Sequence, residues 1–183
     1  MEIYLSDGSR FRPLDPGAFA SLPAGKLLTE IANALSRICR FGGRVTRFIS
    51  VAEHSIYVYY EYASRWPEDY SGQLLALLHD ASEAFLGDIV TPLKKLLPAF
   101  WAMEQKVNWG ILNVLVPMGY QRAEGCIKSC DEEVLGLEVR RFLVYQSFTL
   151  AEDLSSDYWK TEFISIYNRI YNQLVAKIEG TKP

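Results

Sequence analysis

The sequence predicts an all-α fold, a single helical bundle preceded by a small N-terminal β-hairpin. Two observations predict it. Apolar residues recur at three- and four-residue steps through most of the chain, and the features typical of strands are confined to the first dozen residues. A length of 183 residues with 49% apolar residues suits one domain that buries its own core. We therefore expect a single domain over residues 1–183, without a linker or an internal repeat.

The hairpin is predicted at the N-terminus. Ile3-Tyr4-Leu5 and Phe11 lie on either side of Asp7-Gly8, a dipeptide typical of tight turns between strands. A stretch rich in proline and glycine over residues 13–17 then interrupts regular structure. The helical part is therefore expected to begin after this stretch.

Periodicity predicts the helices in chain order. They run over about residues 26–41 (ended by Gly42 and Gly43), 50–63, 70–85 (ended by Gly87), a short piece near 92–97, then 99–116, 123–145 and 156–178. The helix at 50–63 has Ser50 as its predicted N-cap and Glu53 as the capping-box partner three residues later. In the last helix an aromatic-rich stripe that includes Trp159 and Phe163 is expected to be core, with a subunit interface as the alternative.

Composition and charge limit the classes of partner. A formal net charge of -3 gives no basic surface for a nucleic acid duplex. The longest apolar stretches, residues 74–78 and 114–118, are too short to cross a membrane, and no signal peptide is visible. Three cysteines without paired spacing favour a reducing compartment. We expect a cytoplasmic protein that acts on a small molecule, with assembly into a homo-oligomer left open.

The chain's two histidines both lie in contexts typical of metal ligands. His54 follows Ala52-Glu53, His79 is followed at once by Asp80, and Asp131 opens a later amphipathic stretch. Neutral imidazoles and carboxylates together bind divalent transition metals. Adjacent residues on a regular helix point about 100° apart, so a metal shared by His79 and Asp80 would lie in a crevice beside their helix.

Two further acidic residues suggest how such a site could handle protons. Glu83 lies four residues after His79 and three after Asp80, which predicts that the three side chains share one helix face. A carboxylate beside a metal-bound water is suited to general acid or base catalysis. Asp88, just past Gly87, is expected to hold a second metal or to orient the water.

Each residue taken alone has a simpler interpretation. Either histidine could be an ordinary hydrogen-bonded residue, Asp131 could be a helix N-cap, and Glu83 could be a solvated helix residue. Only their combination favours a catalytic site.

Four segments and one aspartate appear in the order found in a known superfamily. They are Arg40-Phe41-Gly42-Gly43, Val51-Ala52-Glu53-His54-Ser55, Leu77-Leu78-His79-Asp80-Ala81-Ser82-Glu83-Ala84, Gly87-Asp88-Ile89-Val90-Thr91-Pro92-Leu93-Lys94 and Asp131. Over about residues 26–145 the chain resembles the HD-domain superfamily of metal-dependent phosphohydrolases. It looks most like the 5'-deoxynucleotidase branch and the compact phage-type dATP triphosphohydrolases.

The resemblance assigns expected roles to individual residues. It implies His54, His79, Asp80 and Asp131 as ligands of a divalent metal (Zn, Co, Mn or Mg), Glu83 as the catalytic carboxylate, Asp88 as a second catalytic acidic position, and Arg40, Phe41 and Lys94 as substrate-binding residues. Arg40 could instead be a charge at a helix C-terminus, and Lys94 could be solvated. Glu138, seven residues after Asp131, is expected on the same helix face and near an arginine.

The expected activity is removal of phosphate or polyphosphate from 5'-phosphorylated deoxynucleosides, with dATP or dAMP favoured by analogy with the compact enzymes. Ala84 stands where guanosine tetraphosphate hydrolases carry an aspartate, which argues against that activity, and Arg44 stands where compact relatives often carry a histidine. The alternatives are a nucleotide-sensing HD module that does not cleave its ligand, and a cyclic-nucleotide phosphodiesterase. If the chain is phage-encoded, its compartment would be the host cytoplasm.

Overall fold

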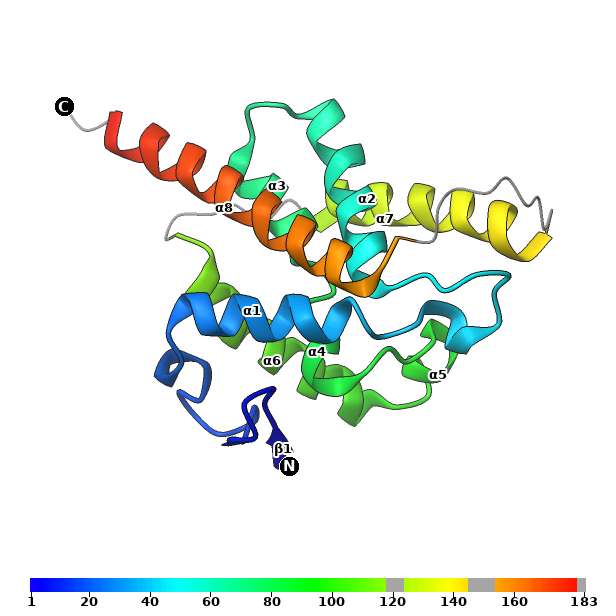
Figure 1. Cartoon of the computed structure of the whole chain (residues 1–183), viewed down its shortest axis with the longest axis horizontal. Coiled ribbons are helices and arrows are strands. Elements are labelled where there is room, and N and C mark those ends of the chain that lie inside the picture. Colours follow the sequence, from blue (N-terminus) through cyan, green and yellow to red (C-terminus); the bar gives the residue numbers. More distant parts are fainter. Residues whose placement is uncertain (118–123, 145–153, 181–183) are drawn as a thin grey trace.

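Helices form most of the structure, a computed structural model that describes residues 1–117, 124–144 and 154–180 (Figure 1). The strands of the described residues make one antiparallel pair, β1 (Ile3–Tyr4) and β2 (Arg10–Phe11). The predicted all-α fold with a small N-terminal hairpin is therefore confirmed.

The hairpin turns where the sequence predicts it. Ile3 pairs with Phe11, and Gly8 adopts a φ of 80°, a conformation that favours glycine. The buried Phe11 ring lies 5.2 Å from the ring of Phe19 and 5.8 Å from that of Phe85. These aromatic contacts attach the hairpin to the helical body.

The described helices follow the predicted order. They are α1 (Ala24–Leu35), α2 (Val51–Arg65), α3 (Tyr70–Leu77), α4 (Glu83–Leu86), α5 (Thr91–Lys94), α6 (Pro98–Leu115), α7 (Glu124–Glu138) and α8 (Ser156–Gly180), with short 3-10 turns η1 (Phe19–Ser21) and η2 (Arg40–Gly43) and a π-helical segment η3 (Val139–Val144). None of them combines the length and apolar character that crossing a bilayer requires.

The core is assembled around α2 and α3. Helix α2 packs against α3 and α7, while α8 lies across α1 and α3 (Figure 1). The predicted stripe of α8 is core within the chain: Phe163 and Ile166 are fully buried, and Trp159 is 7% exposed. The interior is thus closed by the last helix, whose apolar face is used within the chain.

The first long helix ends earlier than predicted, at Leu35 instead of near residue 41. The chain then turns back and pairs with itself: the Arg40 N–H donates to the Ile49 carbonyl, and the Val51 N–H donates to the Ile38 carbonyl. These bonds replace the helical ones and close a loop over residues 40–49. That loop presents the Arg40-Phe41 pair beside α2.

The predicted helix over residues 70–85 is wrong as a single element. Helix α3 ends at Leu77, α4 begins at Glu83, and a series of turns lies between them. The His79 imidazole has its Nδ1 2.8 Å from the Ala76 carbonyl oxygen, which in a continuous helix would accept from the N–H of Asp80. His79 and Asp80 therefore lie on a turn, and the predicted shared helix face with Glu83 does not exist.

Two other local predictions need correction. The Ser50 hydroxyl accepts from the Glu53 N–H at 3.0 Å, as a capping box requires, but the Glu53 carboxylate pairs with Arg47 instead of returning to Ser50. Asp131 lies inside α7, so it is not an N-cap. The predicted ends of that helix, at residues 123 and 145, lie outside the described residues.

Candidate metal centre

The two histidines meet between α2, α7 and the turns that follow α3. His54 comes from the second turn of α2 and is completely buried, while His79 projects from the interruption between α3 and α4. Their ring centroids are 5.3 Å apart. Residues 25 positions apart in sequence are thus brought into one small polar centre within an apolar core.

The predicted ligand atoms converge at this centre. His54, His79 and Asp131 each offer one donor atom within 4.8 Å of the others, a set that could hold a metal ion. The His54 Nε2 lies 3.0 Å from Asp131 Oδ1, and the His79 Nε2 lies 4.0 Å from the same oxygen. Asp80 joins them, with its Oδ2 3.2 Å from the His79 Nε2 and 3.9 Å from the His54 Nε2.

Both imidazoles are oriented by a partner on their other nitrogen. The Nδ1 of His79 lies 2.8 Å from the Ala76 carbonyl oxygen, and the Nδ1 of His54 lies 3.0 Å from Glu138 Oε1. Both partners are acceptors. In the neutral His79 ring, whose Nε2 has no directed partner among the described residues, Nδ1 therefore carries the proton and Nε2 presents its lone pair to the centre. His54 lies between two carboxylates, and an ion on its Nε2 would leave its proton on Nδ1, facing Glu138. Metal-binding histidines usually have such partners.

The donor set fits a divalent ion. The His79 Nε2 is buried and has no directed hydrogen-bond partner among the described residues, although Asp80 lies within ion-pair distance. Donors that bind a tetrahedral ion at about 2.1 Å lie roughly 3.4 Å from one another, and the four contacts among these donors span 3.0–4.0 Å. Two imidazoles and two carboxylates would suit Zn, Co or Mn.

Burial and charge act in opposite directions on these groups. Burial lowers the pKa of His79, but the Asp80 carboxylate, aided by Asp131, outweighs it and raises that pKa to about 9. Burial likewise opposes ionisation of Asp80, yet His79, His54 and Arg40 hold its pKa well below the usual range. Without a cation the carboxylates draw protons to His79, so this centre favours positive charge.

Glu83 lies in a buried position beside Lys94. Only 4% of Glu83 is exposed, and its Oε2 has no hydrogen-bond partner among the described residues. Burial, followed by the negative charge of Asp80, raises the pKa of Glu83 to about 8. The solvated alternative for Glu83 is therefore wrong. A carboxyl group that titrates near neutrality is suited to proton transfer.

Lys94 is also not a solvated residue. Its Nζ donates to Glu83 Oε1 at 3.0 Å and to Glu104 Oε1 at 2.7 Å. Glu104, on α6, was not predicted, because nothing in its local sequence indicates that α5 and α6 fold against each other at this point. The charge of Lys94 is shared between two carboxylates, and its predicted contact with substrate stays a prediction.

Arg40 reaches the centre from the loop over residues 40–49. Its Nε donates to Glu138 Oε2 at 3.1 Å and its NH1 lies 3.8 Å from Asp80 Oδ2. The expected arginine partner of Glu138 is therefore Arg40. The alternative, a charge at a helix C-terminus, is wrong because α1 ends at Leu35.

Phe41 and Asp88 complete the predicted set. The Arg40 guanidinium lies 5.4 Å from the centroid of the Phe41 ring, and Phe41 has a φ of 57°, which is strained for a residue with a side chain. Burial raises the pKa of Asp88, and Arg40 and Asp80 are among the charges that act on it. Both residues therefore lie near the ligand cluster, while their roles stay predictions.

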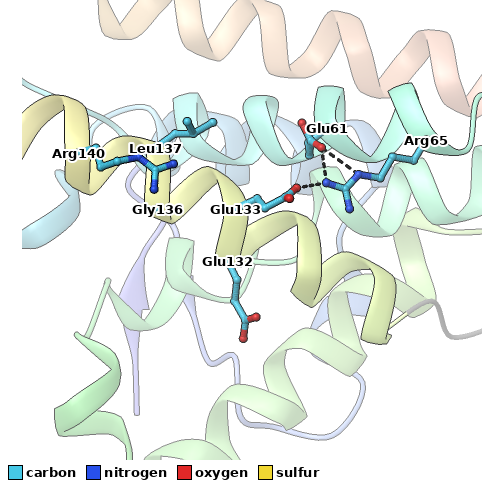
Figure 2. A pocket seen from close by; sticks show the side chains of 7 residues that line it. All are labelled: Glu61, Arg65, Glu132, Glu133, Gly136, Leu137 and Arg140. Atoms are coloured by element: carbon cyan, nitrogen blue, oxygen red, sulfur yellow. Dashed lines mark hydrogen bonds and ion pairs between the residues drawn. The ribbon is translucent and has the colours of Figure 1, made fainter.

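On its opposite side, α7 carries charged surface residues that line a separate hollow. A hollow of about 470 Å³ lies between α2 and α7. It is lined by Glu61, Arg65, Glu132, Glu133, Gly136, Leu137 and Arg140 (Figure 2). Arg65 pairs with Glu61 and Glu133, whereas Glu132 points away from them. No residue of the ligand cluster lines this hollow.

Comparison with known proteins finds two relatives. The chain is 40% identical over 82 residues to "Uncharacterized protein YfdR" of Escherichia coli (strain K12), a match that covers 45% of this chain and 43% of the relative. It is 38% identical over 96 residues to "Uncharacterized protein RCAP_rcc00048" of Rhodobacter capsulatus, covering 48% and 43%. The matches thus span less than half the length of either relative. No protein-family model matches the chain.

Proposed function

We propose that this chain is a metal-dependent phosphohydrolase that acts on 5'-phosphorylated deoxynucleosides. The observation that supports it most is the pair of imidazoles held with both Nε2 atoms toward Asp80 and Asp131. An ordinary core histidine would use both nitrogens in hydrogen bonds, whereas the buried His79 Nε2 has no directed partner among the described residues. The motif resemblance supplies the substrate class.

The chemistry divides among residues of this chain. A divalent ion held by His54, His79, Asp80 and Asp131 would polarise a phosphate oxygen and lower the pKa of a water at the site. Glu83 in its ionised form would accept the proton of the attacking water on Oε2, which has no hydrogen-bond partner among the described residues, while Lys94 holds the other oxygen at 3.0 Å. The geometry therefore leaves one Glu83 oxygen for proton transfer.

The substrate side of the proposal rests on Arg40 and Phe41. The Arg40 NH1 lies 3.8 Å from Asp80 Oδ2, where the guanidinium would offset the charge of a phosphoryl group. The Phe41 ring would pack against the sugar or base. Both residues belong to a loop closed at its base by backbone hydrogen bonds, which fixes their position relative to His54.

The test is release of phosphate from a panel of deoxynucleoside mono-, di- and triphosphates, with cyclic nucleotides included, after reloading with Mn, Co, Zn or Mg. We expect metal-dependent release from deoxynucleotides, with products separated as nucleoside, phosphate and polyphosphate. Tripolyphosphate from dATP would indicate a triphosphohydrolase, and inorganic phosphate from dAMP a 5'-nucleotidase. Metal-loaded protein that binds nucleotides but cleaves none of them would contradict the proposal and favour a sensing module.

A further inference from the structure

Glu138 is a buried acid outside the predicted ligand set. Its side chain is 4% exposed and it is the last residue of α7 before the helix widens into the π-helical η3. A carboxylate withdrawn from water is destabilising unless it is paired and hydrogen-bonded. The structure provides Glu138 with two partners, and these belong to two different parts of the candidate site.

The two oxygens of Glu138 are divided between those parts. Oε1 lies 3.0 Å from the His54 Nδ1, and Oε2 accepts from the Arg40 Nε at 3.1 Å. The first contact offers an acceptor to a proton on Nδ1 of a predicted metal ligand, which is the tautomer whose Nε2 can bind a metal. The second orients the guanidinium that is expected to meet the phosphate. One carboxylate therefore connects the metal centre to the substrate-binding loop.

The His54 ring lies along α7, with a contact at each nitrogen. Asp131 Oδ1 is 3.0 Å from its Nε2, and Glu138 Oε1 is 3.0 Å from its Nδ1. Seven residues advance a helix by roughly 10.5 Å and nearly two turns, which places both acids on one face at the two ends of the imidazole. The spacing leaves His54 little freedom to rotate or to present Nδ1 to the centre.

A second contact fixes this end of α7 against α2. Phe142, four residues after Glu138, is buried in the π-helical segment, and the Arg47 guanidinium lies 4.7 Å from the centroid of its ring. Arg47 also pairs with the fully buried Glu53, the residue before His54. The loop over residues 40–49, the start of α2 and the end of α7 are thus held together beside Glu138.

We propose that Glu138 is a positioning residue that sets the tautomer of His54 through Oε1 and the orientation of Arg40 through Oε2, so that metal binding and phosphate binding depend on the same side chain. This inference rests on the proposed function for its substrate part. A merely structural ion pair would affect folding, but it would leave the metal affinity and KM of the folded protein unchanged.

The variant that tests it is Glu138→Gln, which keeps the shape and one acceptor oxygen but presents an N–H donor to either His54 or Arg40. We expect metal affinity, measured by competition with a chelating dye, to fall roughly 10–100-fold, as for other partners of metal-bound histidines. KM should rise more than kcat falls. Glu133→Gln, on the solvent side of the same helix, is the matched control and should match the wild type in both quantities.

A double-variant cycle tests the contact between Glu138 and Arg40 separately from the contact with His54. Arg40→Gln and Glu138→Gln should each raise KM, and the double variant should raise it by less than the product of the two factors, because each removes the same orientation. Independent, multiplicative effects would overturn the coupling. Folded Glu138→Gln with wild-type metal affinity and KM would overturn the inference as a whole.

A measurement on the wild-type protein needs no variant to fold. In the zinc-loaded protein with 15N-labelled histidine, His54 should carry its proton on Nδ1 and bind metal through Nε2; binding through Nδ1 would overturn the inference.

If Glu138→Gln loses metal affinity while wild-type protein cleaves no nucleotide, the proposed function fails and the positioning of His54 is supported. If nucleotide is cleaved and Glu138→Gln behaves as wild type, the proposed function stands and this inference fails.

Discussion

Helix α7 carries acidic residues on two sides, and the two sides differ in how those residues are used. On the inner side, Asp131 and the 4% exposed Glu138 both contact His54. On the outer side, Glu133 is 57% exposed and pairs with Arg65 at the edge of a hollow (Figure 2). Both sides contain carboxylates, so charge alone does not distinguish a site from a solvated surface.

The difference lies in convergence and in second partners. Inner-side atoms point to one centre shared with His79 and Asp80, and each imidazole is fixed by an acceptor behind it. Outer-side charges form exposed pairs with their neighbours: Arg65 pairs with Glu61 and Glu133 (Figure 2), and Glu132 lies 3.8 Å from Lys128. Imidazoles and carboxylates that converge on one point, with a hydrogen-bond acceptor behind each ring, are the property expected of a metal site, and the residues that line the outer hollow do not have it.

The largest expected effect separates chemistry from binding. Glu83→Gln should lower kcat by about 10²–10⁴-fold, the usual contribution of a general acid or base, while the bound metal stays at the wild-type level. Steady-state phosphate release and metal analysis of the same preparation check this. A variant with wild-type turnover would remove Glu83 from the chemistry.

Removal of a metal ion from the inner side of α7 should lower the Tm of the protein. Metal at 100 times its Kd stabilises a protein by about 2.7 kcal/mol, which for a chain of this size corresponds to a rise in Tm of roughly 5–10 °C. Thermal unfolding with EDTA and with added Zn or Mn should show this difference. A Tm that does not respond to metal would mean that the converging donors do not bind an ion.

The buried Glu83 should also make the free energy of unfolding depend on pH. Burial and Asp80 raise its pKa from 4.5 to about 8 in the folded protein, so between these values the unfolded chain releases a proton that the folded chain keeps, and stability falls as pH rises. In the metal-free state, Glu83→Gln should not show this fall in stability with rising pH, because glutamine does not titrate. Its advantage in free energy of unfolding should be near zero at pH 4.5 and on the order of 4 kcal/mol at pH 8.

Urea unfolding of both proteins in EDTA at several pH values measures that difference. Titration of the histidine cluster is common to the two proteins and largely cancels. An advantage that is constant with pH would show that Glu83 does not titrate in this range.

The smallest effect belongs to the outer side. Arg65→Ala should change the free energy of unfolding by at most about 1 kcal/mol, as expected for exposed ion pairs, and should leave metal content and turnover unchanged. Urea unfolding and phosphate release check both parts. A large loss of activity in this variant would mean that the hollow takes part in function and that the contrast between the two sides is misplaced.

Sequence patterns could predict the bundle because apolar periodicity, the Ser50 cap and Gly87 act locally. They could not predict the break between α3 and α4: the apolar pattern continues through Leu78 and Ala81, and the break depends on a side-chain bond from His79 to the Ala76 carbonyl. A local bond between a side chain and the backbone there competes with the helical hydrogen bonds, and residue propensities do not include it.

The site shows the same division. The order of the motifs predicted that the two histidines and the acidic residues share one site. The spacing of Glu138 from Asp131 predicted that these two lie on one helix face. The Lys94–Glu104 and Arg47–Glu53 pairs could not be predicted in this way, because they depend on how a short helix and a loop fold back on the body. Such contacts follow from tertiary packing, which no local pattern specifies.

The most direct test is the metal stoichiometry of two variants of α7, Asp131→Ala on the inner side and Glu133→Ala on the outer side. After stripping and reloading with Zn or Mn, wild type and Glu133→Ala should each bind one ion per chain at the cluster, and folded Asp131→Ala should lose it. Equal metal content in the wild type and Asp131→Ala would contradict the assignment of this centre as the metal site.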